Sequence, residues 1–253
     1  MDLTEPSLPV IPAADVVVIC AAMARFADCR NDPGRARHVN VSAPLAIASQ
    51  VGEQGCRVIL LSSSAVFDCR SPYVMADQPP APRSAYGRMK AEAEAGILSR
   101  GGTVLRLTKV ITTSMDRLAD WIGVLGSGQS VEAFEDHRFC PIELDNVLDA
   151  VEGIIEQKSA GIFQLSGEED ISYADAARHL ARRLGIPAKR VKGTLAVNSG
   201  VPEDELTPYT SLDTSRLSTL IGYRPLPPRK VIDDVFAASF GHANAPGEIV
   251  SGR

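Results

Sequence analysis

Short apolar runs alternate with amphipathic stretches along the first half of the chain. The runs cover residues 15–22, 58–61 and 103–107. Because their apolar positions are continuous rather than alternating, they predict strands buried on both faces of a parallel sheet. Helices are predicted between them, over about 33–50 and 85–100, and the second helix ends at Gly101–Gly102, where glycine supplies left-handed backbone.

This alternation predicts an α/β fold, a Rossmann-like doubly wound parallel sheet with right-handed crossovers. Beyond Thr108 the pattern loosens, with helices predicted over 118–125, 145–157, 173–184 and 233–240 and a returning strand over 161–165. Ser172 and Asp175 resemble a capping box at the start of the third of these helices. We expect a Rossmann core over 1–112, a mixed substrate-binding lobe over 113–240 and a disordered tail over 241–253.

Within these parts, the proline-rich segment 1–13 is expected to lie on the surface, and segment 187–228 is expected to form a small lobe that covers the site.

Composition narrows the function classes. The 253 residues carry a net charge of −5 with no basic run, which argues against a nucleic-acid partner. Five cysteines without CxxC spacing or a signal peptide favour a reducing cytoplasm and argue against a metal site. The longest apolar runs are too short to span a bilayer, so no membrane association is expected.

A hydroxyl cluster and a Tyr-x-x-x-Lys pair supply the candidate chemistry. Ser62–Ser64 follow the second predicted strand, and ligands of such sheets bind beyond the carboxyl ends of the strands. Tyr86 and Lys90 are four residues apart near the start of a helix, so their side chains share a face.

An ammonium about 4 Å from a phenolate stabilises it by roughly 4 kcal/mol at an effective dielectric of 20. We therefore expect Lys90 to lower the pKa of Tyr86 from about 10 toward neutrality, where the phenol exchanges a proton with a substrate. A serine hydroxyl such as Ser63 would hold the substrate carbonyl oxygen while hydride arrives from a nicotinamide ring.

The runs 61–68 (LSSSAVFD) and 86–94 (YGRMKAEAE) resemble the extended short-chain dehydrogenase/reductases, specifically their dTDP-4-dehydrorhamnose reductase-like branch. Segments 15–22, 39–41, 105–110, 161–167 and 212–217 match the same pattern in order. The sequence departs from it at three positions, with Cys20 for the usual Asn, Ala65 for the common Tyr and Cys69 for the typical Gly.

The resemblance implies roles for individual residues. Ser63 orients the substrate, Tyr86 is the acid/base, and Lys90 lowers the tyrosine pKa and holds the nicotinamide ribose. The remaining implied cofactor contacts of NADPH or NADH are Ala21, Ala22, Asn40, which supports the lysine through water or backbone, Thr108 and Val110. Ser64 and Arg138 are the implied substrate contacts, although a surface salt bridge is the simpler interpretation of Arg138.

The glycine-rich turn that carries the pyrophosphate in this family is not found upstream of Asp15. Asp2-Leu3-Thr4 resembles the tripeptide after the family's third strand, which implies a start after roughly 40 residues of the pattern. Three explanations stay open: a fragment or misplaced start, an exposed sheet edge covered by another subunit or a second copy, or a protein that has given up dinucleotide binding.

The sequence thus predicts a nicotinamide-dependent reductase of a 4-keto nucleotide sugar. The first alternative is a non-catalytic sugar-nucleotide-binding or regulatory protein, and the second is a nucleotide-sugar epimerase or dehydratase. His38, His137, His179 and His242 have no metal spacing and are expected to serve packing or the surface. Trp121 is expected in the core or at a dimer contact.

Overall fold

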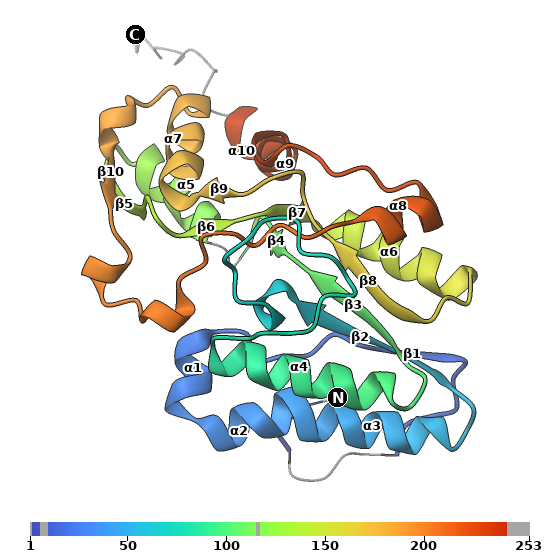
Figure 1. Ribbon diagram of the computed structural model, residues 1–253. Coiled ribbons are helices and arrows are strands. Elements are labelled where there is room, and N and C mark those ends of the chain that lie inside the picture. The colour runs from blue at the N-terminus through green and yellow to red at the C-terminus, as the bar shows by residue number, and fades with distance from the viewer. Residues whose placement is uncertain (1, 6–9, 115–116, 242–253) are drawn as a thin grey trace, which may run out of the picture.

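The computed structural model describes residues 2–5, 10–114 and 117–241 and contains a parallel sheet of four strands at its centre (Figure 1). The order is β1-β2-β3-β8, with β1 at Val16–Ile19, β2 at Arg57–Ser63, β3 at Thr103–Leu107 and β8 at Gly161–Leu165. All pairings within it are parallel. The predicted α/β parallel fold is confirmed, and the returning strand pairs with β3.

Helices cover both faces of the sheet (Figure 1). α3 (Ala43–Gly52) and α4 (Ala85–Leu98) pack on one face, with the apolar cluster that includes Val58, Leu60 and Val104. α6 (Leu144–Glu156) and α8 (Ser215–Ile221) pack on the other, with the cluster that includes Ile59, Leu105 and Phe163. Successive residues of each buried strand therefore contact opposite helix layers, which explains why the runs are continuously apolar.

The helix predicted over 33–50 contains a change of winding. α2 (Pro33–Arg37) leads into a π-helical turn, His38–Ser42, and then into α3. Asp32 begins this run, because its carboxylate accepts from the backbone N–H of Arg35 at 3.0 Å and Pro33 occupies the first turn. A short helix before it, α1 (Phe26–Asn31), was not predicted, since its few residues show no apolar period.

A lobe beside the sheet has its own apolar core. The helices α5 (Arg117–Gly126) and α7 (Tyr173–Arg183) pack on the parallel pair β5 (Val131–Phe134) and β10 (Val191–Thr194), and α9 (Pro228–Val235) packs against α7. The Ser172 hydroxyl accepts from the Asp175 N–H at 3.0 Å, so the predicted cap of α7 is confirmed. Trp121 is buried in this core.

Two short pairs join this lobe to the sheet. β4 (Lys109–Ile111) pairs with β7 (Pro141–Glu143), and β6 (Arg138–Phe139) pairs with β9 (Ile171–Ser172). The remaining elements are α10 (Ala237–Gly241) and the 3₁₀ turns Ser64–Val66 (η2), Ala188–Arg190, Val197–Ser199 and Glu203–Glu205.

Three expectations need correction or restriction. Segment 187–228 is not a separate lobe, because β10 joins β5, while α8 packs against α6 and β8. Leu3 is buried in the core beside α3 instead of lying on the surface, since its side chain joins that apolar cluster. The last predicted helix is divided between α9 and α10, and residues 242–253 of the predicted tail lie outside the described residues.

Membrane-spanning helices are not found in the described part of the chain, where every helix is too short or too polar to cross a bilayer.

The tightest approach between α4 and the end of β2 requires a glycine. A Cβ on Gly87 would lie 2.0 Å from the carbonyl oxygen of Ala65, which is backbone and cannot rotate away. The start of α4 therefore lies directly against η2, and this contact fixes the distance between the helix and the serine cluster.

We predict that Gly87→Ala lowers the free energy of unfolding by about 1–3 kcal/mol, since the added methyl overpacks a backbone contact. Gly123→Ala is the matched control, because Gly123 lies exposed within α5 with nothing within 4 Å of its added Cβ. The control should gain about 0.5–1 kcal/mol from helix propensity. Urea unfolding measures both, and equal stability of the two variants would contradict the close approach.

Candidate functional site

A cavity of about 950 Å³ opens at the carboxyl ends of β1, β2 and β3. Its walls come from the loop after β1, the serine cluster with the start of α4, residues 107–110 at the end of β3, the start of α6, and the inner side of the lobe. Of the residues predicted from sequence, it brings together Ala22, Ser63, Ser64, Tyr86, Thr108, Val110 and Arg138. Ala21, Asn40 and Lys90 are not among its lining residues.

The serine cluster follows β2 in the order that the sequence predicts. Ser63 has extended backbone and precedes η2, and its hydroxyl accepts from the backbone N–H of Ala65 at 3.2 Å. Ser62 is buried, lines the cavity, and its Oγ has no hydrogen-bond partner in the described structure. An unsatisfied buried hydroxyl at a cavity wall is a group that a ligand can satisfy.

Tyr86 is the second residue of α4, which begins where the Ser84 hydroxyl accepts from the Gly87 N–H at 3.0 Å. Its side chain is buried, with the ring of Phe26 5.8 Å away. Burial raises the pKa of Tyr86 to about 12, and a hydrogen bond with the Ser63 hydroxyl acts in the opposite direction. The pKa of Tyr86 is therefore raised and not lowered as predicted, because burial dominates and Lys90 is not among the groups that act on it.

Lys90 lies behind the cavity wall rather than in the cavity. Its Nζ donates to the carbonyl oxygen of Leu61 at 2.6 Å, and only 2% of the residue is exposed. Burial lowers the pKa of Lys90 to about 8, although the nearby Glu94 carboxylate favours the charged form. The ammonium is bonded to the strand that carries the serines, and it is not among the groups that shift the pKa of Tyr86.

Asn40 holds the loop after β1. Its Oδ1 accepts from the Met23 N–H at 2.8 Å and its Nδ2 donates to the Met23 carbonyl at 3.1 Å. The π-helical turn presents this fully buried amide toward the loop. Ala22 lines the cavity on that loop, while the neighbouring Ala21 packs into the core beside α3. Asn40 thus shapes the floor near β1.

An aromatic cluster on the lobe side was missed from sequence. His137 stacks on Tyr173 with ring centroids 5.4 Å apart and planes 10° apart. The Arg117 guanidinium lies 5.6 Å from the centre of the Tyr173 ring and 5.8 Å from that of Phe134. Arg117, His137 and Tyr173 line the cavity, together with the exposed Arg138. A flat aromatic surface beside two guanidinium groups suits a ring that carries phosphates.

His137 is neutral in this cluster. Burial and then the nearby Arg117 lower its pKa to about 4. The Thr207 N–H donates to its Nδ1 at 3.3 Å, a bond that only an unprotonated nitrogen can accept. The assignment of His137 to packing or the surface was incomplete; its adjacency to Arg138, in a region where substrate contacts were expected, was the available signal.

The chemistry open to this arrangement is proton transfer. Tyr86 and the Ser63 hydroxyl lie next to each other at the cavity wall, and both can hydrogen bond one oxygen of a ligand. Within residues 2–5, 10–114 and 117–241, no group of three or more His, Cys, Asp or Glu side chains is placed to hold a metal ion.

Comparison with known proteins gives a family match and several relatives. The RmlD substrate binding domain family matches residues 11–239. Methionine adenosyltransferase 2 subunit beta from Bos taurus is 28% identical over 223 residues, which cover 83% of this chain and 66% of the relative. dTDP-4-dehydrorhamnose reductase from Sinorhizobium fredii is 30% identical over 185 residues, which cover 66% of this chain and 60% of the relative.

The fold recurs in a solved dTDP-4-dehydrorhamnose reductase from Bacillus anthracis, in complex with NADP. The TM-score is 0.79 at 16% identity, with 88% of this chain and 80% of that chain covered. The chain spans 66% of the length of the bovine relative and 60% of the Sinorhizobium one, so both are longer proteins.

We predict that the burial of Lys90 makes stability depend on pH above about 8. Between the folded pKa of about 8 and the ordinary value of 10.5, the unfolded chain binds a proton that the folded chain has lost. Relative to Lys90→Met, the wild-type protein should therefore gain stability as pH rises through this window, by up to about 3 kcal/mol. Urea unfolding of both proteins from pH 7 to 10.5 measures the difference, and a pH-independent difference would refute the low pKa.

Proposed function

Since the chain belongs to the RmlD substrate binding domain family, we propose that its cavity binds a nucleotide-activated sugar and reduces the sugar's 4-keto group with a nicotinamide cofactor. The observation that carries the proposal is the pairing of the Tyr86 phenol with the Ser63 hydroxyl at the cavity wall. The phenol and the hydroxyl can both meet one carbonyl oxygen, which is what ketone reduction requires.

The raised pKa of Tyr86 suits reduction more than oxidation. With a pKa of about 12, the phenol stays protonated at neutral pH and is ready to donate. In the reductive direction, the carbonyl carbon accepts hydride, its oxygen accepts the Tyr86 proton, and the phenolate regains a proton from solvent. Ser63 holds the oxygen while its negative charge develops.

The described residues fit the nicotinamide half of a cofactor. The unpartnered Ser62 hydroxyl of the serine cluster and the small side chain of Ala22 line the cavity, where a carboxamide or ribose could bond and a flat ring could approach. When bound, NADH or NADPH would supply the hydride. In this proposal Thr108 and Val110 line the far side of the nicotinamide, while Lys90 and Asn40 hold the surrounding backbone.

The lobe side of the cavity supports a nucleotide as the activating group. A neutral His137 stacked on Tyr173 offers an apolar, uncharged surface for a base. Arg117 and Arg138 line the same wall and would neutralise a diphosphate. Relatives named as dTDP-sugar reductases make dTDP the first nucleotide to test.

A second candidate, a sugar-nucleotide-binding subunit without catalysis, is favoured by the edge of the sheet. Among the described strands, β1 pairs only with β2, and its Val16 and Val18 are half-buried. An open parallel edge is a surface that a partner chain or a second copy can cover. The relative named as a subunit of methionine adenosyltransferase 2 supports the same alternative.

We predict that Tyr86→Phe lowers kcat for reduction of a dTDP-4-keto sugar by about 10²–10⁴-fold, because it removes the proton donor and keeps the ring. Stopped-flow oxidation of NADPH and NADH measures it. Tyr73→Phe is the control, since Tyr73 is exposed and lies outside the cavity wall.

Calorimetry separates the two candidates. The reductase requires that wild type binds NADPH or NADH, and no binding of either at millimolar concentration would exclude the redox role. The binding subunit instead predicts dTDP binding with biological activity unchanged in Tyr86→Phe.

Arg117→Met should weaken dTDP binding by about 10-fold and flatten its salt dependence, because one charge-assisted phosphate contact is lost. Arg100→Met on the outer surface is the control. Equal affinities of the two variants in calorimetry would place the nucleotide elsewhere.

A further inference from the structure

The face of the sheet that carries α4 turns polar at one position in the strand register. Ser62, Arg106 and Gln164 are paired across β2, β3 and β8, and Arg106 and Gln164 are each 1% exposed. Two residues earlier the same face carries only apolar side chains, Leu60, Val104 and Ile162. A guanidinium buried this deeply needs hydrogen-bond partners for its N–H groups, so the elements that supply these partners are held together by Arg106.

One partner of Arg106 is on the helix that carries Tyr86. Arg106 Nη2 donates to Glu94 Oε2 at 2.8 Å, and its Nε donates to both carboxylate oxygens at 3.1 Å. Glu94 is 2% exposed and lies one turn after Lys90. A two-pronged ion pair between rigid elements fixes rotation as well as distance, so it sets how α4 lies on the sheet.

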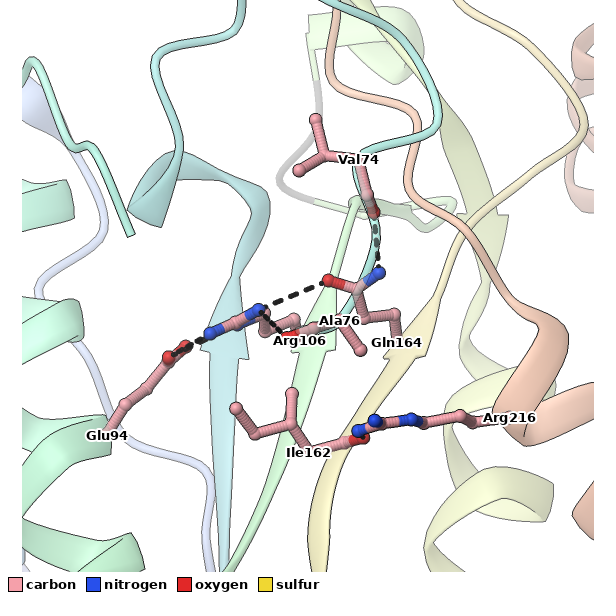
Figure 2. Close-up of polar contacts among 7 residues, drawn as sticks. All are labelled: Val74, Ala76, Glu94, Arg106, Ile162, Gln164 and Arg216. Atoms are coloured by element: carbon pink, nitrogen blue, oxygen red, sulfur yellow. Dashed lines mark hydrogen bonds and ion pairs between the residues drawn. The ribbon is translucent and has the colours of Figure 1, made fainter. Parts of the chain in front are cut away.

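The other partners of Arg106 are on the opposite side (Figure 2). Its Nη1 donates to the Ala76 carbonyl at 3.1 Å and to Gln164 Oε1 at 3.4 Å. Gln164 Nε2 in turn donates to the carbonyls of Val74 at 2.8 Å and Asp213 at 2.9 Å. One buried cluster therefore holds α4 on one side and two loop segments on the other.

Those two segments, 69–76 and 207–213, lie side by side and are called the strap here. The Tyr73 N–H donates to the Ser211 carbonyl at 2.9 Å, and the Tyr209 N–H donates to the Cys69 carbonyl at 3.2 Å. The strap carries three residues into the cavity wall, Cys69, Thr207 and Thr210. Its position therefore shapes the lobe side of the cavity.

We propose that Arg106, Glu94 and Gln164 are positioning residues for the reaction, with two separable arms. The Glu94 arm sets α4 and hence Tyr86 and Lys90, and the Gln164 arm sets the strap and hence the nucleotide side of the cavity. Arg106 joins the arms. The inference rests on the proposed function. It predicts that a substitution in the Glu94 arm alters kcat, whereas a substitution in the Gln164 arm alters the affinity for the sugar nucleotide.

The single variants test this division. Glu94→Gln keeps the shape and removes the charge, so kcat should fall about 10-fold with the KM for the sugar nucleotide within about twofold of wild type. Gln164→Met removes two hydrogen bonds to the strap and one from Arg106, so the KM and the dTDP Kd should rise about 10-fold with little change in kcat. The same loss of kcat and affinity in both variants would overturn the proposal.

A stability-matched variant separates positioning from folding. Replacing a buried ion pair by two apolar side chains often preserves stability, whereas removing one partner does not. Glu94→Met with Arg106→Met should therefore melt near the wild-type midpoint and still show kcat reduced about 10-fold or more. A double variant with the wild-type midpoint, kcat and dTDP Kd would refute the positioning role.

Arg37→Met is the matched control. It breaks the exposed Arg37–Glu92 ion pair, whose Glu92 lies on α4 as well, and it should leave kcat and KM unchanged.

Failure of the proposed function can be distinguished from failure of this inference. If the wild-type protein binds dTDP without turnover, or binds nothing, amide hydrogen exchange tests the two arms directly. Faster exchange over 85–92 in Glu94→Gln and over 207–213 in Gln164→Met would support them. Unchanged exchange at both segments would overturn them.

Discussion

The site depends on how α4 lies on the sheet, because α4 carries the Tyr86 phenol and the end of β2 carries the Ser63 hydroxyl. Lys90 bonds the Leu61 carbonyl at 2.6 Å, and Glu94 bonds the buried Arg106. At the start of the helix, Gly87 allows contact with the Ala65 carbonyl. These three contacts along one face prevent α4 from sliding or rotating on the sheet. They hold the Tyr86 phenol beside the serine cluster without a hydrogen bond between Tyr86 and Lys90.

Local sequence signals predicted the sheet well. The apolar runs place β1, β2, β3 and β8 close to their observed bounds, since a strand buried on both faces leaves a pattern that needs no knowledge of the rest of the fold. The same holds for the cap at Ser172 and for Gly101, which has the left-handed backbone expected after α4. Ser63 and Tyr86 lie together for the same reason, because each follows from a local motif placed on a predictable element.

Features that depend on distant partners could not be predicted in this way. Asn40 faces Met23 because of a π-helical turn that no period reveals, and His137 gains its role from Tyr173, which is 36 positions away in the sequence. The direction of the Tyr86 pKa shift failed for a related reason. Spacing on a helix shows that two side chains share a face, but burial and competing hydrogen-bond partners decide which charges they carry.

The buried carboxylate of Glu94 explains why Arg106 and Lys90 differ. Glu94 lies between two buried cations, and the fork of Arg106 takes both of its carboxylate oxygens. Lys90 is left with a neutral carbonyl as its hydrogen-bond partner, so burial dominates and its pKa falls to about 8. Arginine stays charged at every pH the folded protein meets, whereas Lys90 loses its proton above about pH 8, which makes Arg106 the permanent structural cation of the two.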